Sequence, residues 1–168
     1  MIRLEKFDTK DYSQLINSIK DARELMQFAG PEFTFPLTEE QIERSLSDKN
    51  RIAFRVVNVS NDSTIGHCQI CFKDKFANLG KILIMDELLR GKGIGKQILT
   101  LLLEFILENS KQRNVELNVF DFNTSAIKCY EKIGFVINRD KKFVREMDSE
   151  TWTALNMQLD LDNWIRKD

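Results

Sequence analysis

The chain has 168 residues, of which 42% are hydrophobic and 30% are charged. This is the composition of an ordinary globular protein, and it predicts a single domain over residues 1–168 with a sizeable core. The formal net charge of −1 argues against a nucleic-acid-binding protein with a broad basic face. The N-terminus lacks the apolar core of a signal peptide and no apolar stretch is long enough to span a bilayer, so we expect a cytoplasmic protein without membrane contact.

The first third of the chain predicts one strand and two helices. Residues 2–7 alternate apolar and polar side chains, as a half-buried strand does. Residues 9–26 carry apolar side chains at helical spacing and predict one helix, which the Gly-Pro pair at 30–31 ends. A loop rich in phenylalanine follows over residues 28–36, and a capping box opens a second helix over residues 38–46.

The middle of the chain predicts three strands and a long helix. Residues 51–59 and 64–72 alternate in the manner of a hairpin. Residues 79–85 are apolar in their second half and predict a strand that is buried on both faces. A glycine-rich turn comes next, and residues 94–111 predict a helix that is largely enclosed, because apolar side chains cover most of its circumference.

The last third predicts three more strands and a short helix. Residues 115–119 alternate as a strand does, and residues 123–134 predict a helix with an asparagine cap and a closing glycine. Residues 135–137 begin a further strand, the polar residues 138–150 predict a loop, and residues 155–161 predict the last strand. This order of elements predicts an α/β fold with a mixed sheet that has antiparallel and parallel parts.

The turn between residues 90 and 96 is the strongest functional signal. Glycine occupies positions 91, 93 and 95, and Arg90, Lys92 and Lys96 stand between and beside the glycines. Glycines allow a sharp turn and leave backbone N–H groups uncovered, and a helix N-terminus favours negative charge. The turn therefore predicts a binding site for an anion.

Two common phosphate-binding motifs do not fit this turn. A P-loop needs Ser or Thr after its Gly-Lys pair, whereas Gln97 follows Gly95-Lys96 here. A dinucleotide fingerprint needs a third glycine where this chain has Lys96 or Ile98. The pattern excludes a magnesium-dependent nucleotide site of the first kind and a Rossmann site of the second.

Cys68 and Cys71 have the spacing of a redox or zinc pair. Residues three apart on a strand point to opposite faces, and the chain has no second pair of cysteines and only one histidine. We interpret both cysteines as packing residues and expect no metal site. An odd number of cysteines also fits a reducing compartment.

Two segments resemble the acyl-CoA-dependent N-acetyltransferases of the GNAT superfamily. Arg90-x-x-Gly93-x-Gly95 is similar to that family's Arg/Gln-x-x-Gly-x-Gly/Ala signature. The segment 123–135, with its asparagine, tyrosine and Gly-Phe pair, resembles the family's segment after the fifth strand. The resemblance covers nearly the whole chain and implies the GNAT fold, with a mostly antiparallel sheet of about seven strands and about four helices. The aromatic loop and the Ile-Gly-His at 65–67 look like the branch of ribosomal-protein N-acetyltransferases.

The resemblance implies that the anion is the pyrophosphate of acetyl-CoA, which would act as co-substrate. It also implies that backbone groups of Ile84 and Met85 pair with the pantetheine arm as they would with a neighbouring strand, and the backbone N–H near Met85 could polarise the thioester carbonyl. The residues that this resemblance assigns to the binding of acetyl-CoA are Ile84, Met85, Arg90, Gly91, Lys92, Gly93, Ile94, Gly95, Lys96, Asn123 and Tyr130.

The same resemblance makes Tyr130 the general acid that protonates the departing thiolate. Many family members carry a glutamate base on the strand before the glycine turn, but residues 79–85 contain no acid. His67 is a candidate for the base or for a water relay, and it could equally be a structural histidine. Glu32 and Phe33 are candidate residues for binding the amine substrate, and a solvent-linked base stays open.

We therefore expect an N-acetyltransferase that moves an acetyl group from acetyl-CoA to a primary amine by direct attack in a ternary complex. The acceptor could be a small molecule or a peptide N-terminus, and we expect a monomer or a homodimer. The alternative is a non-catalytic acyl-CoA-binding regulatory module with the same fold.

Overall fold

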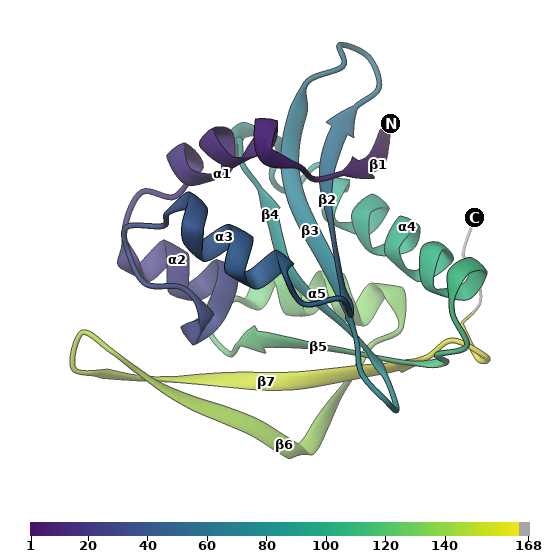
Figure 1. Ribbon diagram of the computed structural model, residues 1–168. Coiled ribbons are helices and arrows are strands. Elements are labelled where there is room, and N and C mark those ends of the chain that lie inside the picture. Colours follow the sequence, from purple (N-terminus) through teal and green to yellow (C-terminus); the bar gives the residue numbers. More distant parts are fainter. Residues whose placement is uncertain (165–168) are drawn as a thin grey trace.

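The structure is a computed structural model that describes residues 1–164. Its centre is a seven-stranded sheet in the order β1-β2-β3-β4-β5-β7-β6 (Figure 1). The strands are β1 (Ile2–Lys6), β2 (Arg51–Asn58), β3 (Thr64–Phe72), β4 (Ala77–Ile84), β5 (Asn114–Phe120), β6 (Val136–Met147) and β7 (Glu150–Asp160). Only β4 and β5 pair in parallel, so the predicted mixed, mostly antiparallel sheet is confirmed.

Helices cover both faces of this sheet. The α-helices in the described residues are α1 (Tyr12–Ser18), α2 (Ala22–Ala29), α3 (Glu39–Leu46), α4 (Ile94–Asn109) and α5 (Thr124–Ile133). Short 3-10 turns lie at η1 (Thr9–Asp11), η2 (Gly30–Glu32) and η3 (Glu87–Leu89). The helices α1, α2 and α3 gather on one side of β2–β4, while α4 and α5 lie on the other side (Figure 1).

The two faces of the sheet bury separate hydrophobic clusters. The larger cluster joins the sheet to α4 through Ile98, Leu99, Leu102, Leu103 and Ile106, all of them buried. The second cluster lies between the sheet and α1–α3, and a third, small one gathers under the β6–β7 hairpin. Burial of apolar area on this scale is the main force that holds the helices against the sheet.

The parallel contact between β4 and β5 is short. Three residue pairs make it, from Ala77 opposite Val115 to Leu79 opposite Leu117, and the two strands do not pair beyond that point. In the same region the register between β3 and β4 shifts after His67, and Lys81 adopts a positive φ of 47°. A shift of this kind bends a strand, so β4 turns away from β5 and leaves an opening between their C-terminal halves.

Four features of the predicted fold need correction. The helix expected over residues 9–26 is two helices, because Ile19 is extended and the Asp21 side chain caps α2 anew. This raises the number of α-helices from about four to five. The polar residues 138–147, expected as a loop, belong to β6. β4 alternates buried and half-buried residues, so it is not enclosed on both faces.

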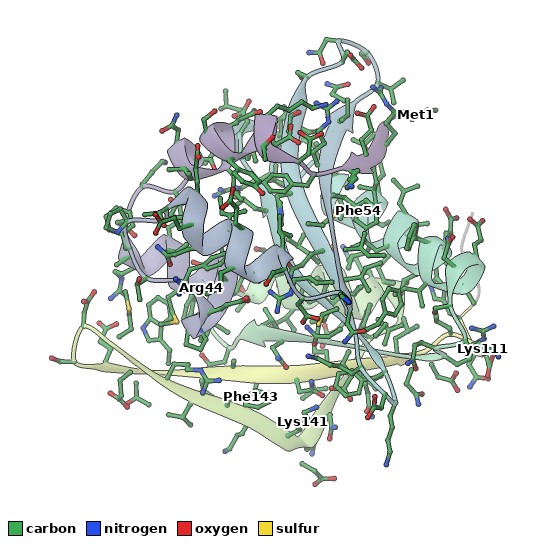
Figure 2. The ribbon with its side chains drawn as sticks, viewed as in Figure 1. Met1, Arg44, Phe54, Lys111, Lys141 and Phe143 are labelled. Atoms are coloured by element: carbon green, nitrogen blue, oxygen red, sulfur yellow. The ribbon has the colours of Figure 1, made fainter. Side chains whose placement is uncertain are left out.

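The β6–β7 hairpin is long and lies at one edge of the sheet. Its tip reaches below α2 in Figure 1, far from the ends of β6 and β7 that lie near α5. Lys141 and Phe143 mark β6 in Figure 2. The hairpin thereby brings Glu150 to the start of α2, where it accepts a hydrogen bond from Arg23 at 3.0 Å.

No helix in residues 1–164 is long and apolar enough to cross a membrane. The same residues hold no group of three or more His, Cys, Asp or Glu side chains that could bind a metal ion.

Candidate functional site

The glycine turn follows directly on the diverging end of β4. Gly91 and Gly93 have φ values of 74° and 81°, a region that residues with a side chain rarely adopt. No atom lies within 4 Å of a Cβ added at either position, so the space above both glycines is open. The turn therefore has the uncrowded backbone that an anion site requires.

The N-terminus of α4 completes this site. Gly93 is the N-cap, and no side chain caps the helix. The first helical bond runs from the Gln97 N–H to the Gly93 carbonyl at 3.2 Å, so the N–H groups of residues 94–96 lie ahead of the helical ladder. Several backbone donors and the positive end of the helix dipole thus converge on one exposed place.

Arg90 does not point freely into solvent. Its Nη2 and Nε donate to the Ile84 carbonyl at 3.1 and 3.2 Å, and its guanidinium lies 3.8 Å from Glu87 and 4.0 Å from Glu24. The side chain therefore ties the turn to the end of β4 and to α2. Lys92 and Lys96 are exposed, and they stand within three residues of the open glycines in the sequence.

Of Ile84 and Met85, the two residues expected to pair with a ligand, only Ile84 directs its backbone groups toward the opening. The Met85 N–H donates to the Ile65 carbonyl at 2.9 Å, so it is already paired with β3. The interpretation of this N–H as a donor to the thioester carbonyl is therefore not supported. Because backbone groups alternate between the two edges of a strand, the N–H of Ile84 faces away from β3 and toward the opening.

Tyr130 belongs to α5, which packs on α4, the helix that follows the glycine turn. A Cβ on Gly95 would lie 3.5 Å from the Cys129 Sγ, which shows how closely the two helices approach. Asn123 caps α5 by accepting from the Ala126 N–H at 3.3 Å, and Gly134 ends it with a φ of 121°. The structure thus brings the two sequence motifs together where Gly95 faces Cys129.

The Tyr130 ring is half-buried. It meets the Phe135 ring edge to face, with 6.2 Å between the centroids. Burial raises the pKa of its phenol well above the ordinary value of 10, and the neighbouring Cys129 adds to the effect. Tyr130 is therefore a protonated hydroxyl at neutral pH, the form that a general acid needs.

His67 lies in a closed apolar environment. Its side chain is on the α1–α3 face of the sheet, between Phe7 at 4.7 Å and Phe28 at 5.7 Å, and the residue is only 2% exposed. Its Nδ1 is 2.9 Å from the Lys81 carbonyl. Burial lowers the pKa of the imidazole to about 4, so the ring is neutral at pH 7. This placement favours a packing role for His67 over the base or relay that was considered for it.

Glu32 and Phe33 turn toward the sheet. Glu32 accepts from the Ser45 hydroxyl at 2.8 Å and from Arg51 at 2.5 Å, and it also pairs with Lys81. Phe33 is buried, and the Lys81 ammonium lies 4.9 Å from its ring. The carboxylate that was expected to bind the substrate amine is therefore already paired with two cations of the protein.

Lys81 is a buried charge that the sequence interpretation missed. Burial lowers the pKa of Lys81 more than the contact with Glu32 raises it. Burial alone would raise the pKa of Glu32, but Lys81, Ser45 and Arg51 lower it below its ordinary value. The signal in the sequence was a lysine inside an apolar strand, where charges are rare unless they are paired.

A pocket of about 680 Å³ opens between the start of α2 and the β6–β7 hairpin. It is lined by Lys20, Asp21, Arg23, Glu24, Gln27, Phe122, Glu150, Thr151 and Trp152. It contains three carboxylates and two aromatic rings, which suit a cationic amine, and two cations, Lys20 and Arg23, each of which is already paired with a carboxylate. A larger hollow of about 1120 Å³ lies where β4 and β5 begin and are still paired, away from the glycine turn. The smaller pocket is therefore the better candidate for the amine.

Comparisons with known proteins match this chain to one family model and to several relatives. Residues 19–135 match the model of the Acetyltransferase (GNAT) family. A spermine/spermidine N(1)-acetyltransferase of Bacillus subtilis is 36% identical over 59 residues, which are 35% of this chain and 39% of that protein. An uncharacterised prophage-derived N-acetyltransferase of the same organism is 31% identical over 100 residues, 58% of this chain and 52% of the relative. The chain thus spans about half the length, or less, of these relatives.

Solved structures share the fold over nearly the whole chain. A spermidine N-acetyltransferase from Vibrio cholerae, in complex with CoA and spermine, has a TM-score of 0.77 at 20% identity, with 96% of each chain covered. A chimera of that enzyme has a TM-score of 0.80 at 18% identity, with 99% of each chain covered. Because both identities are below 25%, these structures show the shared fold alone.

Replacing Gly93 with valine should abolish measurable CoA binding, a weakening of at least about a hundredfold. A β-branched residue is strained at a φ of 81°, so the turn must change shape and its N–H groups must move. Isothermal titration calorimetry with CoA measures the loss. Gly80→Ala on β4 is the control, because its Cβ would make only an ordinary 3.7 Å contact. Binding by a folded Gly93→Val protein at the control's affinity would show that the anion site lies elsewhere.

The buried His67 should make the protein less stable in mild acid. Its pKa of about 4 in the folded state lies below the 6.5 of the unfolded chain, so the unfolded state binds more protons between these values. The contribution of neutral His67 to the free energy of unfolding is therefore complete above pH 6.5. It decreases by about 3 kcal/mol as the pH falls toward 4. Urea unfolding of the wild type and His67→Asn at several pH values isolates the effect. A difference between the two proteins that stays constant with pH would contradict it.

Proposed function

The chain belongs to the GNAT family of acetyltransferases, and we propose that it transfers an acetyl group from acetyl-CoA to a primary amine. The observation that carries this proposal is the diverging end of β4, which is followed directly by the uncapped glycine turn at the start of α4. The helix α5, which bears Tyr130, packs against α4.

The residues at the opening fit the donor. Acetyl-CoA, when bound, supplies the activated acetyl thioester. The backbone N–H groups of residues 91–96 would hold its pyrophosphate, with the exposed Lys92 and Lys96 adding positive charge nearby. The Ile84 N–H faces the opening and is the strand donor available to the amides of the pantetheine arm.

Tyr130 would protonate the thiolate as it leaves. Burial holds the phenol in its protonated form, and the same apolar surroundings would raise the pKa of a thiolate beside it, so the two stay closer in acidity than they are in water. The packing against Phe135 holds the ring in place. The hydroxyl therefore needs little reorganisation at the moment of transfer.

The best candidate for binding and deprotonating the amine is Glu24. It lines the pocket under the β6–β7 hairpin, and one of its oxygens lies 4.0 Å from Arg90, which itself contacts the Ile84 carbonyl at the opening. Its other oxygen accepts from the Lys20 backbone N–H at 2.6 Å, which fixes the carboxylate. Glu24 thus reaches from the pocket toward the strand end that receives the donor.

We propose a polyamine as the acceptor. Relatives with this activity in their names support it, and so does a pocket that combines Asp21, Glu24 and Glu150 with Phe122 and Trp152. The protein would act in the cytoplasm, where a reducing environment suits the three free cysteines.

Tyr130→Phe should lower kcat about a hundredfold while the affinity for CoA changes less than about twofold. The ring and its packing remain, so only the proton donor is lost. Release of the CoA thiol with spermidine as acceptor measures kcat, and calorimetry measures CoA affinity. The control is Tyr12→Phe, which removes the hydroxyl of a buried tyrosine on α1. A change at Phe135 would be a poor control, because Phe135 is fully buried. Full activity of Tyr130→Phe would remove its role as the acid.

Glu24→Gln should lower kcat/KM for spermidine roughly a hundredfold, because glutamine neither attracts an ammonium group nor accepts its proton. It should leave CoA affinity nearly unchanged. The same thiol assay applies, and the exposed Glu40 on α3, which lies outside this pocket, provides the matched Glu→Gln control. An unaltered pH profile and rate in Glu24→Gln would exclude it as the base.

A further inference from the structure

Arg23 fills a cation site on the wall of the acceptor pocket. Its guanidinium carbon lies 5.0 Å from the centroid of the Trp152 ring, over the ring face. Its Nη2 donates to Glu150 at 3.0 Å, and its Nη1 lies 3.6 Å from Asp148. An aromatic face combined with two carboxylates is a strong arrangement for recognising a cation, whether guanidinium or ammonium.

The receiving side of this contact is firmly built. Trp152 is 6% exposed, and it meets Phe120 at 5.1 Å and Phe122 at 4.9 Å, edge to face. Its indole N–H donates to the same Glu150 oxygen that accepts from Arg23, at 3.2 Å. The ring and the carboxylate are therefore oriented by the hairpin itself and do not depend on the arginine.

Arg23, in contrast, is a long side chain in the first turn of α2. Its side chain is 48% exposed, and those of Glu150 and Asp148 are 59% and 62% exposed. Ion pairs this accessible contribute little to folding, because water screens them and ordering both side chains costs entropy. A different cation can therefore replace the guanidinium without a large penalty to the fold.

The cation site that Arg23 fills lies in the same pocket as Glu24, the carboxylate proposed to bind the reacting amine. Glu24 follows Arg23 on α2, and both line the pocket with Trp152 and Glu150. We propose that Trp152, Glu150 and Asp148 bind a second ammonium group of the acceptor, and that Arg23 fills this site until the acceptor displaces it. The proposal rests on the proposed function and deepens it: acceptors with two or more amino groups on an aliphatic chain are favoured over monoamines.

The test compares spermidine with n-butylamine as acceptors at saturating acetyl-CoA. Glu150→Gln keeps the shape and the hydrogen bond from Trp152 but removes the charge, so KM for spermidine should rise about tenfold and KM for n-butylamine should change less than about twofold. Arg23→Gln removes the internal competitor, so KM for spermidine should fall several-fold. The matched control is Asp62→Asn. This variant removes an exposed carboxylate on the β2–β3 turn, where Asp62 pairs with Arg3 of β1.

Equal changes in KM for both amines in Glu150→Gln would overturn the second ammonium site. A KM for spermidine that stays constant or rises in Arg23→Gln would overturn the role of the arginine as its occupant. Calorimetric titration of spermidine into the CoA-bound protein gives the same comparison without turnover. If the wild type acetylates no amine but Glu150→Gln still weakens spermidine binding about tenfold, the site stands and the proposed activity fails. If turnover is normal but neither variant alters spermidine binding, only the site fails.

Discussion

The end of hydrogen bonding between β4 and β5 is the constraint on which the rest of the site depends. Beyond Leu79 and Leu117 the two strands no longer pair, so the backbone groups on their facing edges need another partner. A ligand that carries its own amides can supply one, and an anion can occupy the uncapped turn that follows β4. Coenzyme A carries both kinds of group on one molecule, with the amides and the pyrophosphate at different places along it. The backbone geometry thus matches the donor before any side chain is considered.

The bend that opens β4 places Lys81 on the side of the sheet that α1–α3 cover, and the surrounding residues compensate for its charge. Burying an unpaired ammonium group would cost several kcal/mol. Glu32 offsets it, Arg51 and Ser45 share the same carboxylate, and Phe33 covers the ammonium. These contacts hold η2 and the loop after it against the sheet. The cluster therefore explains why an acidic residue in the aromatic loop is structural, although its sequence context suggested substrate binding.

Local features of the sequence predicted the glycine turn and the helices on either side of the candidate site. The turn before Ile94, and the asparagine and glycine that bound α5, each depend on residues close together in the chain, so a sequence pattern can reveal them. The resemblance to a family added the assignment of Tyr130 as the general acid, which stays a prediction. What the pattern could not reveal were contacts between distant segments. The Arg23–Glu150 pair joins residues 127 positions apart, and the two rings that enclose His67 come from separate elements.

Other errors arose where the usual periodicity is misleading. β6 is the edge strand, so solvent reaches much of it and its polar residues show no apolar face that would mark a strand. Without β6 as a strand, the hairpin tip could not be placed beside α2, and the pocket between them was missed. In the first helical region the apolar spacing continues through Ile19, whereas the backbone becomes extended there because Asp21 caps a new helix.

The position of Arg90 has a thermodynamic consequence. Its guanidinium contacts the Ile84 carbonyl on the proposed donor side, and it lies 4.0 Å from Glu24, which lines the proposed acceptor pocket. One cation would therefore be shared between the two halves of the proposed site. If the binding of one ligand alters these contacts, the change in free energy is passed on to the other ligand, and the coupling has the same size in both directions. The two binding equilibria would then be linked through a single side chain.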